Sequence, residues 1–333
     1  AQPLHVGHKE VVAHKLNLSI TTVSRALDGY PDVSAATRDK VVKTAREMGY
    51  APNRAARQLR RRRSDTIGYI IPASGNGFAD AFFSEFIAGL GDEASAHNFD
   101  LLVSTAAPNS PDECALYQRW VQSGKVDGMV LNRIRLTDWR LEFLQEQRLP
   151  HVSLERSPGQ ENFVGIEVDS NNGMVELIAH LINLGHSRIA YIGGDPGLKI
   201  DQDRRAGYQA GLAAASVTPL PHLSLQTDLT SDSGYQAATR LLELALPPTA
   251  LVCINDRVAI GAMHAVHQAG LRVGRDIAVA GFDGIISAAH TQPPLTTIDQ
   301  PVYEIARQLV KMLLPLINGE ELPQPQIAVH PRL

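Results

Sequence analysis

Residues 10–27 read EVVAHKLNLSITTVSRAL, a pattern typical of two short helices joined by a tight turn. In the first helix, Val11, Val12 and Leu16 fall on one face. Asn17 suits the turn that follows, because asparagine tolerates the left-handed backbone conformation. The segment therefore predicts a helix, a turn and a second helix.

Ser19 is a suitable N-cap for the second helix, over residues 20–27. The inward positions of that helix are Val23, Ala26 and Leu27, and the outward ones are Ile20, Thr21, Ser24 and Arg25. A third helix is predicted between its N-cap Ser34 and Gly49; its apolar positions are Val41, Val42, Ala45 and Met48. Three such helices form a helix-turn-helix unit, which lays its second helix in the major groove of DNA.

The net charge of −4 hides an uneven distribution. Residues 1–63 contain 13 Lys and Arg against 5 Asp and Glu, whereas the remaining 270 residues contain 18 against 30. This asymmetry favours a small module that binds a polyanion, attached to a larger body that does not bind one. A solvated basic face stays open as the alternative, because charge alone does not decide between them.

The segment after the third helix combines a chain break with a run of arginines. Residues 50–53 are Tyr-Ala-Pro-Asn, residues 54–59 fit a short helix, and residues 60–63 are four arginines. Without DNA we expect a disordered basic linker. On DNA, Ala56 would allow close approach to a groove, and Leu59 would act as a wedge between base pairs.

The rest of the chain alternates between strands and helices. The predicted strands are 66–72, 101–104, 126–131, 151–154, 188–193, 250–254 and 277–282. Continuous Val and Ile runs separated by helices indicate parallel sheets covered on both faces. The number of elements exceeds what one sheet holds comfortably, so we expect two α/β subdomains.

Polar side chains at the carboxyl ends of these strands are the candidate ligand site, because open α/β sheets bind ligands there. They fall in residues 72–83, at Asn132, at Glu155 and Arg156, at Asp195, at Asn255 and Asp256, and at Phe282 and Asp283. Short polar groups together with phenylalanine suit a sugar, because hydroxyls need paired hydrogen-bond partners and a pyranose face stacks on an aromatic ring.

Other functional classes find little support. The chain has no GxSxG, Walker or HExxH pattern, which argues against an enzyme. Cys114 and Cys253 are too few for a disulfide framework, and His264 and His267 are expected to be core or surface residues rather than metal ligands. No apolar run approaches a membrane span, and the N-terminus lacks the apolar core of a signal peptide. We expect a cytoplasmic protein with no cofactor and no metal.

Several motifs, in the same order along the chain, resemble the lactose/galactose-repressor (LacI/GalR) family. They are Val23–Arg25, Val33–Val41, Gly49–Asn53, Ala55–Leu59, Asn255–Met263 and Pro293–Ile298. One departure is the stretch 8–13, HKEVVA, which lacks the threonine cap and the aspartate that usually open the family's first helix.

The resemblance implies three domains. They are a helix-turn-helix head over 1–50, a hinge helix and linker over 51–64, and a body over 65–333. The body is expected to resemble type I periplasmic sugar-binding proteins, with two parallel-sheet subdomains and chain crossings near 160–165 and 285–300.

For DNA, the resemblance implies base reading by Ile20 and Thr21, with Arg25 on the same face. Ile20 and the Thr21 methyl suit thymine methyl groups, and Arg25 suits guanine O6 and N7. A phosphate contact is the alternative for Arg25. The remaining predicted DNA contacts are Ser19, Thr22, Ser24, Ser34, Thr37, Asn53, Ala56 and Leu59.

For the effector, the resemblance makes Arg204 the main gripping residue and Asp283 the acid that binds hydroxyls. The other predicted contacts are Phe83, Asn132, Arg156, Asn255, Asp256 and Phe282. Three alternatives stay open: Asp256 and Asp283 as helix caps, Arg156 paired with a carboxylate, and Arg133 and Arg135 as solvated side chains. Leu229 stands where some relatives carry an aromatic residue that stacks on the ligand.

The predicted function is a bacterial transcription regulator, acting as a repressor at the nucleoid. It would bind a nearly palindromic operator as a homodimer, under the control of a small molecule, expected to be a sugar, between the lobes. The chain end lacks a leucine heptad extension, which favours a dimer over a tetramer. A sugar-binding protein or a sugar-processing enzyme without DNA regulation is the alternative.

Overall fold

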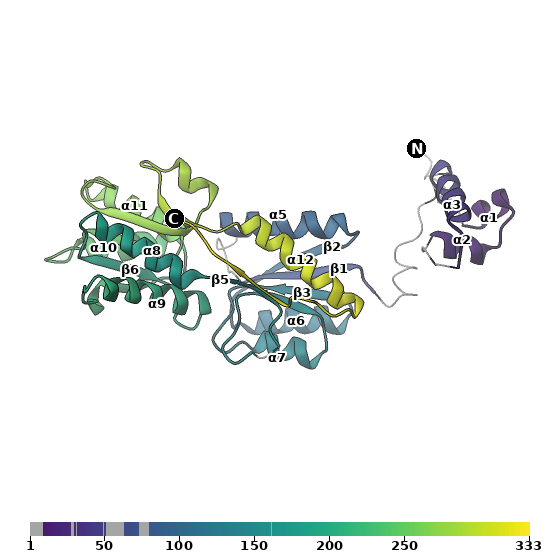
Figure 1. The fold of residues 1–333 in the computed structure, drawn as a ribbon, viewed down its shortest axis with the longest axis horizontal. Coiled ribbons are helices and arrows are strands. Elements are labelled where there is room, and N and C mark those ends of the chain that lie inside the picture. The colour runs from purple at the N-terminus through teal and green to yellow at the C-terminus, as the bar shows by residue number, and fades with distance from the viewer. Residues whose placement is uncertain are drawn as a thin grey trace. The chain divides into compact units, whose positions relative to one another are not determined.

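The computed structural model describes residues 9–27, 30, 32–48, 50, 63–72, 80–160 and 162–333. It divides into two compact units, Ala1–Ser64 and Asp65–Leu333, here called the head and the body (Figure 1). The predicted hinge contacts Asn53, Ala56 and Leu59 lie outside the described residues. Within the described part, no helix is long and apolar enough to cross a membrane.

The described residues of the head form three helices, α1 (Lys9–Leu16), α2 (Ile20–Leu27) and α3 (Ala35–Glu47). Asn17 makes the left-handed turn between α1 and α2, with φ at 55°. The hydroxyl of Ser19 accepts the Thr22 N–H at 3.0 Å. The buried core is Val12, Ala13, Val23, Ala26, Val33, Val41 and Ala45. This is the predicted helix-turn-helix arrangement.

One predicted core position of the head is wrong. Val11 is 49% exposed, whereas Ala13 is buried. The buried face of α1 runs through Val12, Ala13 and Leu16, which share one side of a helix at 3.6 residues per turn. Val11 lies beside that face, on its solvent edge.

The first lobe of the body has one parallel sheet in the order β11-β5-β4-β3-β1-β2. Its strands are β1 (Thr66–Pro72), β2 (Asp100–Ala106), β3 (Gly128–Leu131), β4 (His151–Leu154), β5 (Gly165–Val168) and β11 (Gln326–Val329). Its helices are α5 (Ala81–Ala96), α6 (Pro111–Gln122), α7 (Trp139–Glu146) and α12 (Val302–Asn318).

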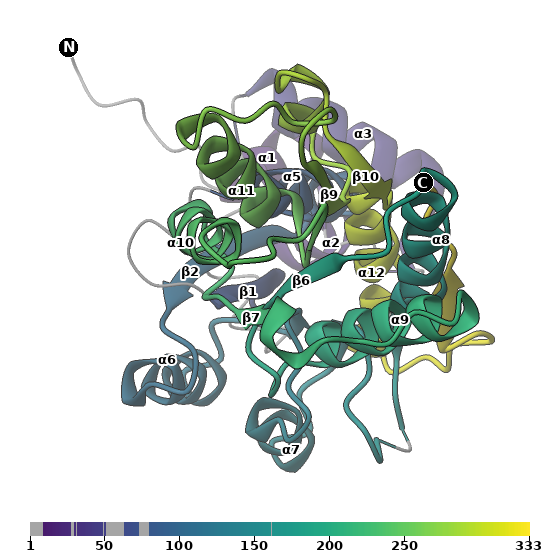
Figure 2. The same ribbon diagram turned by 90° about the vertical axis from the view of Figure 1, so that its left-hand side faces the viewer.

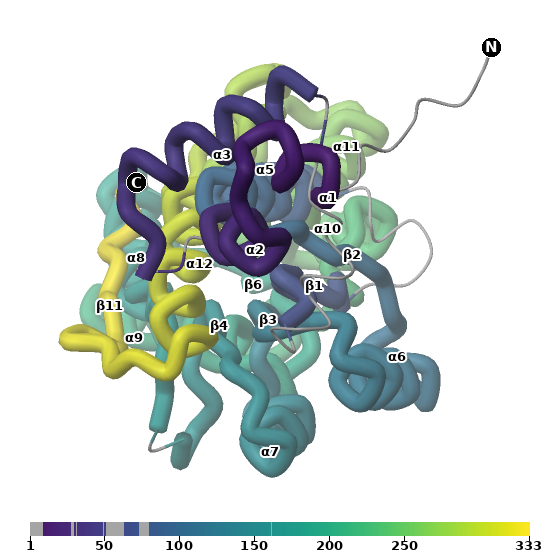
Figure 3. Tube along the Cα trace, turned by 90° about the vertical axis from the view of Figure 1, so that its right-hand side faces the viewer, coloured from purple at the N-terminus to yellow at the C-terminus, as the bar shows by residue number. Residues whose placement is uncertain are grey.

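Side chains alternate across this sheet and bury both faces. Ile67, Tyr69 and Ile71 of β1 pack in a core with α5 and α12. Ile70, between them, packs in a second core with α6 and α7. Figure 3 shows these two helix pairs on opposite sides of the strands. Two covered faces explain why the strands read as continuous apolar runs.

The second lobe has a parallel sheet in the order β10-β9-β8-β6-β7. Its strands are β6 (Ile189–Gly193), β7 (Ser224–Gln226), β8 (Ala250–Cys253), β9 (Ala278–Asp283) and β10 (Thr296–Asp299). Its helices are α8 (Ser170–Asn183), α9 (Lys199–Ala214), α10 (Ser231–Leu242) and α11 (Asp256–Gln268), with short 3-10 turns at Pro221–Leu223 and Ile286–His290. The pair α8 and α9 and the pair α10 and α11 cover its two faces (Figure 2).

The chain crosses between the lobes at three places. It leaves the first sheet after Val168, a few residues beyond the predicted crossing at 160–165, because β5 still pairs with β4 and β11. It returns between Asp299 and α12, at the end of the predicted range 285–300. Near the chain end, Arg332 exchanges two backbone hydrogen bonds with Asp299, at 2.6 and 2.9 Å.

The contact between α5 and α12 depends on a glycine. A Cβ added at Gly89 would lie 2.3 Å from the Tyr303 carbonyl oxygen and 2.8 Å from the Ala306 Cβ. We therefore expect Gly89→Ala to lower the free energy of unfolding of the first lobe by about 1–3 kcal/mol. Urea unfolding can be followed by the fluorescence of Trp120 and Trp139, because both lie in this lobe.

Gly91→Ala is the matched control on the same helix. Among the described residues outside its own helix turn, only Leu101 Cδ2 lies within 4 Å of the added Cβ, at 3.9 Å. It should leave stability unchanged or raise it by up to about 1 kcal/mol, because alanine favours helix. Equal stability of the two variants would contradict the tight helix contact.

Candidate functional site

Two adjacent cavities lie between the lobes, at the carboxyl ends of their strands. The inner chamber, of about 40 Å³, is lined by Asn132, Glu155, Arg204, Asn255, Asp283 and Gln300 among others. The outer chamber, of about 530 Å³, is lined by Arg135, Thr137, Asp195, Leu198, Thr227 and Asp228 among others. Arg133 and Leu229 line both chambers and form the neck between them.

A buried ion pair forms one wall of the inner chamber. Arg204, from α9, donates through Nη2 to Asp283 Oδ1 at 3.2 Å and through Nη1 to the Ile254 carbonyl. Its guanidinium carbon lies 3.7 Å from the centre of the Phe282 ring, a cation–π contact that holds it in place. Gln300 Nε2 donates to the same Asp283 oxygen at 2.8 Å.

Two asparagines add short polar groups to the inner chamber. Asn132 donates through Nδ2 to the Tyr69 hydroxyl at 2.7 Å, and its buried Oδ1 has no partner among the described residues. Asn255 is the N-cap of α11, and its Oδ1 accepts the Val258 N–H at 2.9 Å. Its side-chain amide nitrogen is left for other partners.

Burial raises the pKa of three acids in and beside the inner chamber. The pKa of Glu155 is raised from 4.5 to about 8, and the nearby charge of Asp203 adds to this effect. The pKa of Asp283 is raised to about 7, although Arg204 opposes the shift. The pKa of Asp256 is raised to about 6, although a hydrogen bond from Thr297 opposes the shift. Of the three, only Glu155 has a pKa above neutral pH and is mainly protonated there.

Four residues of the inner chamber adopt the left-handed region of backbone space. Their φ angles are 47° at Arg133, 76° at Glu155, 66° at Leu229 and 121° at Asp283. Such conformations are unfavourable for residues other than glycine and gather at ligand sites. Four of them around one small cavity mark it as a functional site.

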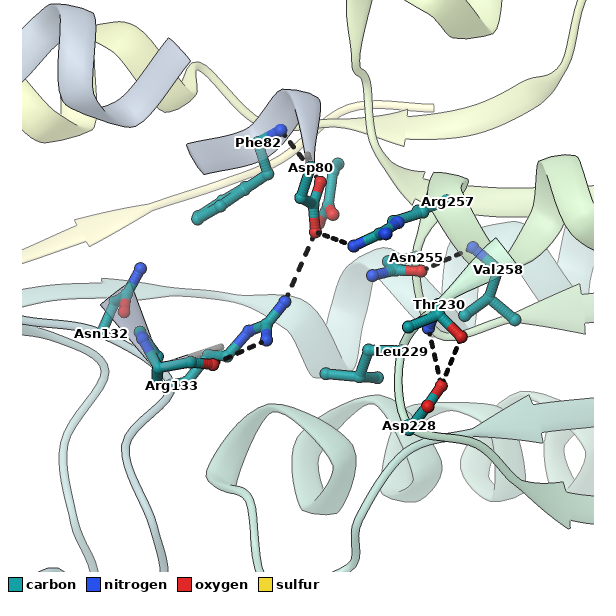
Figure 4. A network of polar contacts seen from close by, with 12 residues as sticks. Asp80, Phe82, Asn132, Arg133, Asp228, Leu229, Thr230, Asn255, Arg257 and Val258 are labelled. Carbon is teal, nitrogen blue, oxygen red and sulfur yellow. Dashed lines mark hydrogen bonds and ion pairs between the residues drawn. The ribbon is translucent and has the colours of Figure 1, made fainter. Parts of the chain in front are cut away.

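A charged network connects the lobes beside the chambers (Figure 4). Asp80 caps α5 through Phe82 N, and its Oδ2 lies 3.4 Å from Arg133 Nη2 and 3.9 Å from Arg257 Nη1 of the second lobe. Arg133 also lies 4.6 Å from the centre of the Phe83 ring. Its side chain is 17% exposed, so it is not a solvated side chain.

Two backbone hydrogen bonds also join the lobes at the outer chamber. Leu136 N donates to the Gly197 carbonyl at 2.9 Å, and Lys199 N donates to the Ile134 carbonyl at 2.8 Å. We call these two bonds the main-chain latch. Both distances are typical of backbone hydrogen bonds, so the latch joins the two lobes at this edge in the present arrangement.

The structure brings half of the predicted effector residues together. Asn132, Arg204, Asn255 and Asp283 all line the inner chamber. Phe282 lies behind them, buried under Arg204, and would act by holding that arginine.

The other three predicted effector residues lie elsewhere. Phe83 is buried in the core, under Arg133. Arg156 lies outside the chambers, with Nε 3.4 Å from Glu167 Oε1, as the alternative pairing predicted. Asp256 is buried outside the lining and accepts from Ile285 N at 2.9 Å and from Thr297. Its role is to fix the turn after β9.

Sequence reasoning missed four further residues that line the inner chamber, Leu154, Ile200, Ile254 and Gln300. Asp80 and Phe82, which also line it, fall within the predicted range 72–83 but were not singled out. Gln300 carried a usable signal, because it directly follows β10. Asp80 carried another, as an N-cap residue before an apolar helix. Among the described residues, no group of three His, Cys, Asp or Glu is arranged to hold a metal.

In the head, the predicted DNA-reading face of α2 is accessible. Ile20 is 42% exposed, Thr21 and Arg25 are exposed, and Ser24 is half-buried. Arg25 Nη2 lies 2.6 Å from Asp32 Oδ2, and its guanidinium lies over the Tyr30 ring at 5.2 Å. These contacts hold the arginine on the outer face.

The serine and threonine candidates of the head have a structural role as well. The hydroxyls of Ser19 and Thr22 lie 2.8 Å apart, and so do those of Ser34 and Thr37. Both serines also accept a backbone N–H at their helix starts, at 3.0 and 3.2 Å.

Comparison with known proteins agrees with this geometry. Residues 10–53 match the model of the bacterial regulatory proteins of the lacI family, and residues 178–333 match a periplasmic binding protein-like domain. The regulator AglR of Rhizobium meliloti is 35% identical, over 95% of this chain and 90% of its own length. The repressor CytR of Escherichia coli is 34% identical, over 93% of this chain and 90% of its own length.

Solved structures extend the likeness. The lac repressor dimer bound to operator and an anti-inducer aligns with a TM-score of 0.82 at 28% identity, covering 98% of this chain and 97% of that one. The complex of the regulator CelR with cellobiose aligns with a TM-score of 0.75 at 29% identity, covering 98% of both chains.

A helix-turn-helix head followed by a two-lobed body with a cleft at its strand ends defines a ligand-responsive DNA-binding regulator. The chain belongs to the LacI family of transcriptional regulators. The relatives named above are regulators rather than enzymes, in agreement with the predicted non-enzymatic function.

The raised pKa of Glu155 has a consequence for stability. Between pH 4.5 and about 8 the unfolded chain has lost this proton while the folded chain retains it, so stability falls as the pH rises. Glu155→Gln removes this dependence. We expect a flatter curve of unfolding free energy against pH than in the wild type, measured by urea unfolding at a series of pH values.

Glu146→Gln, the same change on the exposed surface of α7, is the control and should keep the wild-type slope. Asp283 and Asp256 give the wild type the same sign of dependence, so the slope of Glu155→Gln is reduced rather than abolished. An unaltered slope in Glu155→Gln would show that this acid is ionised in the folded protein.

Proposed function

We propose that this regulator is a repressor whose operator affinity is set by a sugar bound between the two lobes of the body, with hydroxyls in the inner chamber. The observation that carries the proposal is the Arg204–Asp283 pair, buried between the lobes and surrounded by short polar groups. A sugar hydroxyl both donates and accepts, so a carboxylate beside a guanidinium suits it. CelR, a relative in fold, is solved with cellobiose.

The coupling between the two ligands follows from the two lobes. A ligand that contacts Asn132 and Glu155 of the first lobe and Arg204 and Asp283 of the second changes the preferred spacing of the lobes. The segment that joins the head to the body leads directly into β1 of the first lobe. A change of lobe spacing in a dimer alters the separation of the two heads, so effector and operator affinities are linked reciprocally.

On DNA, the proposal assigns α2 to the major groove, with Ile20, Thr21 and Arg25 against base edges. One head covers one half-site, so a homodimer would bind a nearly palindromic operator, as the lac repressor dimer is solved on its operator. Asn53, Ala56 and Leu59 are proposed to contact the operator centre. Such a regulator would work at the nucleoid, in the cytoplasm.

The role of Arg25 can be tested by its effect on specificity. With an operator selected from a random DNA pool, Arg25→Ala should weaken operator binding by about 1–3 kcal/mol and leave non-specific binding nearly unchanged, if the guanidinium reads a guanine. Fluorescence anisotropy at several salt concentrations measures both quantities.

Arg46→Ala removes the same charge from α3 and should leave the ratio of specific to non-specific affinity unchanged. If Arg25→Ala instead weakens both DNAs equally and reduces the salt slope by about 1, Arg25 contacts phosphate and the base-reading role is wrong.

The effector site can be tested at Arg204. A thermal-shift screen against sugars, sugar phosphates, nucleosides and purines identifies a ligand, since one at 100 times its Kd stabilises by about 2.7 kcal/mol. Arg204→Ala should then lose the response of operator binding to that ligand while keeping operator affinity. Its loss removes the guanidinium that would donate to a bound hydroxyl and leaves Asp283 without its cation.

Arg156→Ala is the matched control, because Arg156 lies outside both chambers. It should keep the full effector response. A response that survives in Arg204→Ala, or is lost in Arg156→Ala, would move the effector site elsewhere. If only purines bind, the protein is still a ligand-responsive regulator, but the proposed sugar effector is wrong.

A further inference from the structure

We propose that the effector is an uncharged, linear oligosaccharide of at least two rings. One end lies in the inner chamber, and the rest passes the neck between Arg133 and Leu229 into the outer chamber. The inference rests on the proposed sugar effector and adds its size and charge.

The first argument is the space on each side of the neck. The inner chamber, at about 40 Å³, holds only a few water molecules in this conformation. The outer chamber, at about 530 Å³, falls within the usual range for small-molecule sites, about 300–1,000 Å³. A ligand whose terminal hydroxyls reach Asp283 therefore has its free space on the far side of the neck.

The second argument is charge. The arginines that line the chambers already have carboxylate partners: Arg133 and Arg257 lie against Asp80, Arg135 against Glu113, and Arg204 against Asp283. The Arg135–Glu113 pair is bidentate, at 2.8 and 2.9 Å. An anionic ligand would have to break one of these buried pairs, which is costly. Because each lining arginine is already engaged with a carboxylate, a neutral ligand is favoured.

The third argument is unsatisfied hydrogen-bonding groups on both sides of the neck. Arg135, in the outer chamber, is 6% exposed, and its Nη1 has no partner among the described residues. In the inner chamber, Asn132 Oδ1 and Arg204 Nε are also buried and have no hydrogen-bond partner among the described residues. Buried polar atoms without partners are unfavourable, so a shift of the lobes that brings ligand hydroxyls to these atoms is stabilising. A monosaccharide cannot serve both chambers at once.

The fourth argument is the neck itself. Leu229 keeps its left-handed backbone, and a Cβ added at Gly194 would lie 2.8 Å from Leu229 Cδ2. The absence of a side chain at Gly194 therefore makes room for Leu229 at this position. Leu136, Leu198 and Leu229 give the outer chamber apolar walls beside its polar groups, which suits the two kinds of surface on a sugar ring.

Isothermal titration calorimetry of the full chain tests the inference. The probes are glucose with maltose, cellobiose and trehalose, galactose with lactose and melibiose, and fructose with sucrose, together with glucose 6-phosphate and glucuronate. We expect one disaccharide to bind at least about tenfold more tightly than either of its monosaccharides, and more tightly than the two anions.

A bulky residue in the outer chamber gives a second measurement. Thr137 is exposed and lines the outer but not the inner chamber. Thr137→Trp should weaken disaccharide binding more than monosaccharide binding and so remove the advantage of the disaccharide. Thr137→Ser, the matched control, should keep the wild-type preference.

The outcomes separate the inference from the proposed function. A monosaccharide that binds within about threefold of every disaccharide containing it would overturn the inference and leave a sugar-responsive regulator. If glucose 6-phosphate or glucuronate binds more tightly than every disaccharide, the inference that the effector is uncharged is wrong. A disaccharide preference that survives in Thr137→Trp would place the second ring outside the outer chamber. Binding of none of the sugars would overturn the sugar effector and the inference with it.

Discussion

The carboxylate of Asp283 ties the ligand cleft to a crossing between the lobes. Its Oδ1 accepts from Arg204 of α9 and from Gln300, and the Asp283 carbonyl accepts the Gln300 N–H at 3.3 Å. Gln300 lies in the segment that leads from β10 to α12 and so to the first lobe. A ligand that competes for this carboxylate therefore changes the hydrogen bonds of the crossing itself.

The cleft gathers features that cost stability. Its acids have raised pKa values, four of its residues have left-handed backbone, and three of its buried polar atoms have no partner among the described residues. The apolar cores of the two lobes offset this cost. Unfavourable features of this kind persist where the surrounding structure holds them in place, and they gather at ligand sites.

The sequence predicted most of the fold, because its signals are local. Runs of Val and Ile predicted most of the strands, and Asn17, Ser19 and Ser34 predicted where the head helices begin or end. The ligand site was half predictable, because strand ends are visible in a sequence but side-chain directions are not. After β4, the left-handed Glu155 faces the chamber and Arg156 faces outward. At α5, the Asp80 cap sets the helix phase, and Phe82 rather than Phe83 lines the chamber.

The contacts that the described residues make between the lobes beside the chambers explain how a small ligand can influence their spacing. The main-chain latch contributes two backbone hydrogen bonds, and the Arg257–Asp80 pair is long, at 3.9 Å. Each hydrogen bond contributes about 0.5–1.5 kcal/mol net, so opening the latch costs about 1–3 kcal/mol. Ligand contacts of similar size on both lobes are enough to shift the equilibrium between lobe arrangements. A ligand that fills the outer chamber acts beside the latch, whereas one confined to the inner chamber acts through Asp283 and the crossing alone.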